Sequence, residues 1–411
     1  MILSANILAL AGLAIIGFKL SSKSEIIRFY WPGLSLKIIA GIALGLIYSY
    51  YYTSGDSWVM FNESVRIANT AFSSTDSFID IYFASDYSAI PNYPYSIRPR
   101  PAFMTKILAP LVVITSHNYW LSACYLSLFS FFGFWLAANT IYRIFTSTIT
   151  AVLPTLFFPS IIFWSSGVLK DSIAMGSLLG VMAILINIYF KKRVSWLNLI
   201  ALIIGLFFLI NLKYYYAATL IVAFATIFFS RFILRGKRNW YIELGAMLLL
   251  FISILGIASM LHPNFWPSRF LKVITDNYYQ FIAHSATENI VSFNNLSPTI
   301  ASFLIYSPKA LFAGLFYPLW SPLFSWLKIA AVLENWFLLL SFIYGIQYFK
   351  LPVLRDNRIL FFGMAMFVLT SAIFITFSTP NLGTLVRFKI GYLVVFVIMI
   401  VALITRRAKT V

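Results

Sequence analysis

Long apolar runs that contain few or no charges constrain this chain more than any other feature. The runs at 2–18, 118–140 and 359–378 hold no charged residue at all. About 20 apolar residues are enough to cross the hydrocarbon core of a bilayer as a helix. Lipid offers the backbone no hydrogen-bond partner, so only helices and closed β-barrels span it, and barrel strands read as alternating segments of about ten residues. The unbroken runs therefore predict an all-α, polytopic transmembrane helical bundle.

The composition agrees with this fold class. Hydrophobic residues make up 61% of the 411 residues and charged residues only 10%, against roughly 25% in soluble domains. We expect a single transmembrane domain over residues 1–411, with no soluble domain at either end and with the first apolar run retained as a span. About eleven spans are predicted, near 2–18, 36–52, 118–140, 150–164, 172–190, 195–211, 215–230, 241–260, 325–346, 359–378 and 386–405.

Basic residues are concentrated in alternate loops between these runs. Cytoplasmic loops of membrane proteins are enriched in Lys and Arg, so the pattern predicts an outer N-terminus and a cytoplasmic C-terminus. The same loops, with attraction to anionic lipid, account for the net charge of +18 without nucleic acid, for which no binding motif is present. The residues assigned to the cytoplasmic side are Lys19, Lys23, Arg28, Lys37, Arg143, Lys191, Lys192, Arg193, Arg231, Arg235, Lys237, Arg238, Lys350, Arg355, Arg358, Arg406, Arg407 and Lys409.

Two long segments, 53–106 and 261–324, then fall on the outer side. Residues 57–73 mix apolar and polar side chains and predict a helix on the membrane surface. Residues 101–115 and 300–324 are apolar but too short or too proline-rich to cross, so we expect juxtamembrane or re-entrant helices there.

Cysteine and histidine exclude several kinds of site. Cys124 is the only cysteine, which leaves no disulfide framework. His117, His262 and His284 are the only histidines and lack the spacing of zinc ligands, so no metal site is predicted from them.

The outer segments also carry many basic residues. This is unusual, because membrane proteins concentrate Lys and Arg in their cytoplasmic loops. Charges at the membrane interface are costly unless they are paired or used. Arg and Lys bind phosphate well, and the natural anion at this depth is a lipid-linked phosphate. The outer basic residues are Arg66, Arg98, Arg100, Lys106, Lys170, Lys213, Arg269, Lys272, Lys309, Lys328, Arg387 and Lys389.

Asp56 follows Gly55 just past the second predicted span. Gly55 permits a sharp turn that would present the carboxylate at the mouth of a cavity. One interpretation is a general base that takes a proton from an acceptor hydroxyl. The other is a residue that caps a helix beginning at Ser57.

Three further clusters share the outer side, and each has a structural alternative. Lys170 and Asp171 open a predicted helix, where they either bind substrate or complement the helix dipole. Lys213 precedes Tyr214 and Tyr215. These tyrosines either line the substrate site or belong to an interfacial aromatic belt. Arg387 begins the last span and either binds phosphate or extends to the interface.

The order of these elements resembles the GT-C-type membrane glycosyltransferases that use polyprenyl-phosphate sugars, over roughly residues 36–190. The residues that carry the resemblance are Asp56 at the start of a long outer loop, the segment Arg98-Pro99-Arg100-Pro101, which is similar to the basic proline-containing segment of the family-39-like branch, and the stretch from Pro159 to Asp171. The resemblance implies a GT-C-like catalytic module at 36–190, preceded by an extra span and cytoplasmic loop at 1–35 and followed by a variable helical region at 191–411. It further implies that Asp56 is the catalytic base and Asp171 a second acidic residue of the site.

We therefore expect an enzyme that transfers a sugar from a polyprenyl-phosphate donor to a glycan, lipid or protein acceptor on the outer face, in a bacterial inner membrane. Arg98, Arg100, Lys170, Lys213 and Arg387 would stabilise the leaving phosphate. No cofactor is required, although a divalent cation shared by Asp56 and Asp171 stays open. The alternatives are a polymerase or ligase acting on polyprenyl-diphosphate-linked glycans, and a lipid or solute transporter, which would place ionisable residues in broken helices at mid-membrane.

Overall fold

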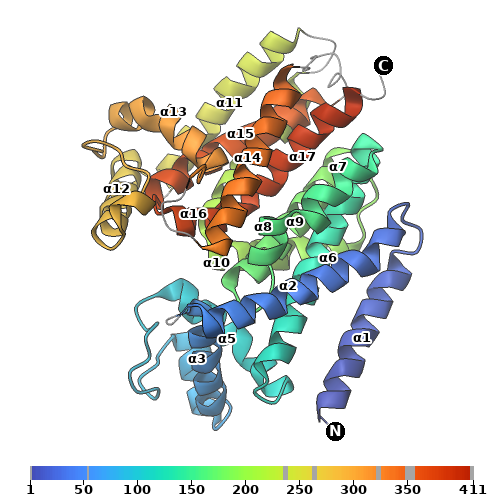
Figure 1. The fold of residues 1–411 in the computed structure, drawn as a ribbon, viewed down its shortest axis with the longest axis vertical. Helices are drawn as coiled ribbons and strands as arrows, with labels where there is room; N and C mark the ends of the chain where they lie inside the picture. Colours follow the sequence, from blue (N-terminus) through green and yellow to red (C-terminus); the bar gives the residue numbers. More distant parts are fainter. Residues whose placement is uncertain are drawn as a thin grey trace. The chain divides into compact units, whose positions relative to one another are not determined.

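The computed structural model describes residues 2–52, 55–234, 239–261, 266–320, 325–347 and 357–407. Over these ranges the chain is helical without strands, apart from one isolated bridge between Ile290 and Asn381 (Figure 1). The expected all-α fold class is confirmed. The chain divides into two compact units, Met1–Ala217 (unit 1) and Ala218–Val411 (unit 2), and α10 runs across the boundary.

Unit 1 begins with two long helices joined by a short loop and continues through three shorter helices to two long buried ones. Its elements are α1 (Ile2–Leu20), η1 (Ile27–Phe29), α2 (Tyr30–Tyr50), α3 (Asp56–Ala71), α4 (Thr75–Ile79), the π-helical turn η2 (Asp80–Ala84), α5 (Pro99–Ile114), α6 (Tyr119–Phe145), α7 (Thr148–Val152), the π-helical turn η3 (Leu153–Phe157), α8 (Pro159–Trp164), α9 (Lys170–Tyr189) and the first part of α10 (Trp196–Ile233).

Unit 2 contains the rest of α10, the long helices α11, α14, α15 and α17, and three shorter helices. Its elements are α11 (Trp240–Leu261), α12 (Pro267–Ala283), η5 (Thr287–Asn289), α13 (Ile300–Phe316), α14 (Trp326–Gln347), α15 (Arg358–Ser378), α16 (Leu382–Phe388) and α17 (Ile390–Arg407). The predicted juxtamembrane segment 300–324 is helical over 300–316 as α13, and its last four residues lie outside the described ranges.

Within the described residues, eight helices are long and apolar enough to cross a membrane. The pair α16 and α17, bent by 66°, raises the number to nine if it forms one broken span. This supports an integral membrane protein. The helices that pass are α1, η1 with α2, α6, α9, α10, α11, α14 and α15.

Three of the predicted spans have a different form in the structure. The run at 150–164 is divided among α7, η3 and α8, because Pro154 and Pro159 lack the backbone N–H that a continuous helix needs. The runs at 195–211 and 215–230 are joined in α10, where only Lys213 has non-helical backbone angles (φ −143°, ψ 61°). The expected short outer turn is thus a one-residue break.

Glycines bring α6 and α9 into close contact in the centre of unit 1. Gly176 and Gly180 form a G-x-x-x-G pattern on α9, and Gly133 of α6 lies directly against the backbone of Gly176. A Cβ atom on Gly133 would overlap the carbonyl group of Gly176. Small residues at such positions let two helix backbones approach, which is a frequent way for membrane helices to pack.

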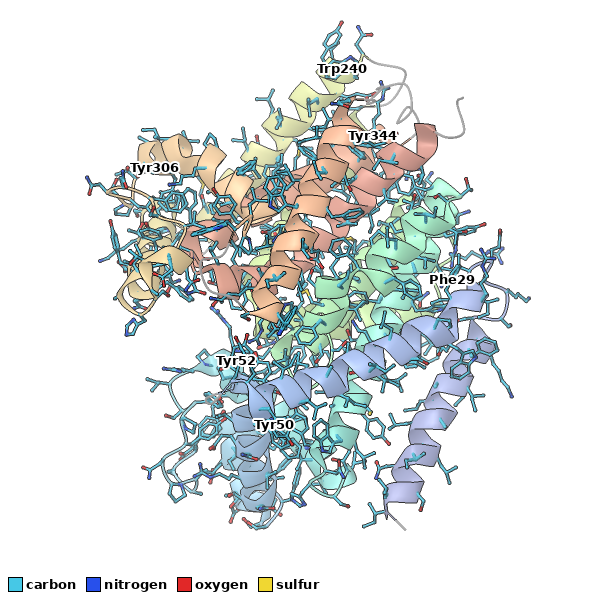
Figure 2. The ribbon with its side chains drawn as sticks, viewed as in Figure 1. Phe29, Tyr50, Tyr52, Trp240, Tyr306 and Tyr344 are labelled. Carbon is cyan, nitrogen blue, oxygen red and sulfur yellow. The ribbon has the colours of Figure 1, made fainter. Side chains whose placement is uncertain are left out.

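Hydrogen bonds define two opposite ends of unit 1. At one end, the loop after α1 meets the last turns of α6, where Tyr142 donates to Glu25 at 2.7 Å. At the other end, Asn6 near the start of α1 donates to the carbonyl of Ile114, the last residue of α5, at 3.0 Å. Figure 2 likewise shows Phe29 at one end of α2 and Tyr50 and Tyr52 at the other. We call the end that carries α3, α5 and the end of α2 the Asp56 end.

Lys37, an expected loop residue, lies well inside a helix instead. Lys37 was assigned to the first cytoplasmic loop, but it occupies the third turn of α2 and is 1% exposed. Its ammonium group donates to Ser165 and lies 3.7 Å from the ring centre of Phe134. The apolar run does not reveal this, because the two partners come from α6 and from the residue after α8.

Candidate functional site

Asp56 is the first residue of α3, and its side chain is exposed. Gly55 occupies the cap position with extended backbone angles, so α3 begins at Asp56, one residue before the start that the capping interpretation expected. A Cβ atom on Gly55 would overlap the ring of Tyr48, two residues before the end of α2. Gly55 thus allows the chain to turn closely past α2 and present Asp56 at the surface.

Ser57, the next residue, fixes the start of α3. Its hydroxyl donates to the carbonyl of Val168 at 2.7 Å and accepts from the hydroxyl of Tyr119, also at 2.7 Å. Trp58 stacks on the Tyr119 ring at 3.8 Å and donates to the carbonyl of Gly45 at 3.2 Å. The residue that carries the exposed carboxylate is therefore followed by two residues anchored to α2, α6 and the loop before α9.

That loop turns sharply at Gly167, which has a φ of +68°. Its N–H donates to the Ser127 hydroxyl of α6 at 3.0 Å, and it lies directly against Gly41 of α2. The positive φ and the close approach both favour glycine. The turn brings Val168, and with it Lys170 and Asp171 at the start of α9, to the Asp56 end.

Tyr95 lies in the electric field of three charged residues of the outer segment. Burial, followed by the negative charges of Asp56 and Glu63, raises the pKa of Tyr95 to about 12, while Arg98 opposes the shift. Glu63 is itself held by Arg66, whose guanidinium donates to both carboxylate oxygens at 2.9 Å. Asp56, Glu63 and Arg98 are therefore close enough to act on one phenol.

Asp171 and Lys213 form a buried ion pair. The Lys213 ammonium lies 2.8 Å from Oδ1 of Asp171, and the two side chains are 5% and 1% exposed. Lys213 is the residue at the break in α10. The pair brings together two residues predicted for the site, but each charge is already paired with the other.

A ladder of aromatic contacts links this ion pair to the surface. The Lys213 ammonium lies 5.6 Å from the ring centre of Tyr215, and the Tyr215 and Tyr214 rings meet edge to face at 5.8 Å. The Arg100 guanidinium stacks over the Tyr214 ring at 4.3 Å. Arg100 is exposed and is the second residue of α5.

The remaining predicted residues divide between the two units. Arg98 is exposed at the cap of α5, and Lys170 is half-buried as the first residue of α9, so both belong to the Asp56 end. Arg387 belongs to the last turn of α16 in unit 2 and is 9% exposed. Its predicted role stays a prediction.

Four residues with defined places at the Asp56 end were not in the predicted site. Ser57 and Tyr119 hold the start of α3, and Tyr95 is a phenol whose pKa both Asp56 and Glu63 raise. Glu63 is two helical turns from Asp56 on the same face of α3, a spacing that the sequence shows. Tyr119 and Tyr95 have no local signal, because their positions depend on how α6 and the loop fold back.

A divalent cation shared by Asp56 and Asp171 does not fit this geometry, because the Asp171 carboxylate is buried and paired with Lys213. Across the residues that the structure describes, no group of three or more His, Cys, Asp or Glu side chains is placed to hold a metal ion.

No protein-family model matches the chain, and no curated protein or solved structure shows significant similarity to it.

Proposed function

We propose that this integral membrane protein is a glycosyltransferase that moves a sugar from a polyprenyl-phosphate donor to an acceptor hydroxyl. The observation that carries the proposal is the exposed carboxylate of Asp56 on a rigidly anchored helix start, with the exposed cations of Arg98 and Arg100 at the same end of unit 1. A base for the acceptor and cations for the leaving group are the two requirements of this reaction.

In the proposed step, Asp56 accepts the proton of the acceptor hydroxyl as that oxygen bonds to the anomeric carbon of the sugar. The bond from this carbon to the phosphate oxygen breaks, and the polyprenyl phosphate leaves with the bonding electrons. Arg98 and Arg100 stabilise the charge that develops on the phosphate. The positive-inside pattern supports an outer N-terminus and an Asp56 end that faces the outer side. The membrane we propose is a bacterial inner membrane.

The test replaces Asp56 by Ala and by Asn in cells and in purified protein. Lipid-linked and surface glycans are analysed, and transfer from a polyprenyl-phosphate sugar is measured. We expect both variants to lose at least about 100-fold in transfer, as removal of a general base usually does. Asp76→Ala is the matched control, because Asp76 is an exposed acid in the first turn of α4 in the same segment. A normal glycan profile with well-folded Asp56→Ala protein removes Asp56 from the reaction.

A transporter is the second candidate, and Lys389 is the observation that favours it. Lys389 separates α16 from α17 at the 66° bend, is fully buried, and interacts electrostatically with Glu334 of α14. Charged residues at broken helices are typical of transport sites. Lys389→Gln would then abolish lipid or solute movement across proteoliposomes, whereas an enzyme that needs only the Asp56 end would keep its transfer activity.

A polymerase or ligase that uses polyprenyl-diphosphate-linked glycans would place the same groups around a larger leaving group. The products distinguish it, since such an enzyme joins whole glycan chains and the proposed transferase adds single sugars.

A further inference from the structure

The burial of the Lys213–Asp171 ion pair limits what the two residues can do. The side chains exclude water almost completely, and the ammonium–carboxylate distance is 2.8 Å. An anionic ligand could reach Lys213 only by breaking this pair, and removing one partner from a buried ion pair is strongly destabilising. The buried pair therefore argues against a direct contact between Lys213 and phosphate, and against a catalytic role for Asp171.

The pair instead sits where the backbone of α10 departs from helical geometry. Lys213 alone has non-helical angles within the 38 residues of α10, and its side chain is tied to the first turn of α9. In a continuous α-helix each side chain is rotated by about 100° around the helix axis from the one before it. The break changes that direction for Tyr214, the residue that follows.

Tyr214 is 37% exposed, and its ring lies under the Arg100 guanidinium at 4.3 Å. Stacking uses the flat face of a guanidinium and leaves its edge, with the fork of N–H donors, directed to a ligand. Two of the first three residues of α5 are Pro99 and Pro101, which have no N–H, so this helix start offers few backbone donors to an anion. Recognition of a phosphate at α5 then depends on the Arg100 side chain.

We propose that Arg100 on Tyr214 is the receptor for the donor phosphate, and that Asp171 and Lys213 are positioning residues that hold Tyr214 beneath it. The choice of ligand rests on the proposed function, while the positioning relationship does not. The chain of contacts runs from Asp171 through Lys213 and Tyr215 to Tyr214 and Arg100.

The experiment measures binding of undecaprenyl phosphate, which carries no sugar, to the purified full-length protein in detergent by intrinsic tryptophan fluorescence. Arg100→Ala removes the proposed phosphate contact and is expected to weaken binding at least about tenfold, and Tyr214→Leu, which leaves the guanidinium without its stacking partner, by less. The double variant should lose little more than Arg100→Ala alone, because Tyr214 acts on the phosphate only through Arg100. Tyr214→Phe keeps the ring and should recover binding, and Tyr241→Leu, an exposed tyrosine of α11, is the matched control.

The positioning residues are tested by Lys213→Met, Asp171→Asn and the exchanged pair Asp171→Lys with Lys213→Asp. We expect each single variant to weaken undecaprenyl phosphate binding and the exchange to restore part of it. In transfer assays the KM for the donor should rise several-fold with little change in kcat, a split that general loss of folded protein does not produce. If the exchanged pair fails to fold, the two single variants, measured on the folded fraction, still decide the question.

Binding of undecaprenyl phosphate by Tyr214→Leu or Lys213→Met at the wild-type affinity would overturn the inference, as would full additivity of Tyr214→Leu and Arg100→Ala. The proposed function fails separately. If Asp56→Ala leaves glycans unchanged while the binding series behaves as expected, the receptor stands and the transfer reaction does not.

Discussion

The hydroxyl of Ser57 lies 2.7 Å from the carbonyl oxygen of Val168, so the residue after Asp56 is bonded to the loop that leads into Lys170 and Asp171. This single contact joins two segments that the sequence separates by more than one span. It also receives support from Tyr119, which donates to the same hydroxyl.

Ser57→Ala removes both hydrogen bonds and leaves two buried groups, the Val168 carbonyl and the Tyr119 hydroxyl, without this partner. We expect a loss of about 1–3 kcal/mol in stability, because unsatisfied buried polar groups carry that cost, and a lower kcat from a displaced Asp56. Thermal unfolding in detergent and the transfer assay measure the two effects. The control is Ser64→Ala, since Ser64 is buried in the same helix and bonds only within it, to Met60. Equal effects from the two variants would contradict the anchoring role.

Gly133→Ala should destabilise the contact between α6 and α9. The added methyl group would meet the carbonyl of Gly176, and overpacking of this kind costs about 1–3 kcal/mol. Gly12→Ala is the matched change, because no atom lies within 4 Å of a Cβ at Gly12, and alanine is the better helix former there. Unfolding followed by circular dichroism or by fluorescence of a thiol dye on Cys124 compares the variants. A similar stability of both would argue against close packing at Gly133.

The raised pKa of Tyr95 predicts a loss of folding stability at alkaline pH. Its pKa is about 12 in the folded protein against a reference of 10.0, so the folded state holds the phenolic proton more tightly than the unfolded state. Stability from this difference is fully present below pH 10 and is lost as the pH rises from about 10 to about 12. Tyr95→Phe cannot ionise and should show a smaller loss of stability over that window than the wild type. Identical pH dependence of the melting temperature in both proteins would contradict the shift.

Lys389 should stabilise unit 2 by tying three elements together. Its ammonium group donates to the carbonyl of Tyr317 at 3.1 Å and to the side chain of Asn335 in α14. Lys389→Met leaves these two oxygens without the ammonium and should cost about 1–3 kcal/mol. Asn335→Leu removes the Asn335 oxygen but also the amide that donates to the Pro318 carbonyl at 3.2 Å. The two changes together should therefore cost less than the sum of the single changes, as measured by thermal unfolding. If the double variant is less stable than the sum of the single changes, the contact is not the source of the effect.

The sequence predicted best what depends on local chemistry. The helix expected over 101–115 appears as α5 at 99–114, and the one expected over 57–73 appears as α3 at 56–71, since proline and glycine mark both starts. The apolar runs likewise predicted most of the long helices. The resemblance to GT-C enzymes and the roles taken from it stay predictions.

Contacts between distant segments could not be predicted. Asp171 and Lys213 were both selected for the site, yet nothing in their surroundings indicates that they pair or that the pair coincides with a break in α10. No glycine or proline stands at Lys213, so the departure from helical geometry comes from tertiary contacts. The same holds for Tyr95, because the electrostatic effect of Asp56 on its pKa depends on the fold of the outer segment.

The buried ammonium of Lys37 has a consequence for biogenesis. A lysine inside an apolar helix disfavours membrane insertion by about 2.5–3.5 kcal/mol when the helix is alone. Its hydrogen-bond partner, Ser165, is synthesised 128 residues later, and Phe134 also follows α2 in the chain. Until those residues leave the ribosome, α2 is a poor substrate for release into lipid. We therefore expect α2 to insert more readily once α6 and the residue after α8 are available to hold the ammonium group.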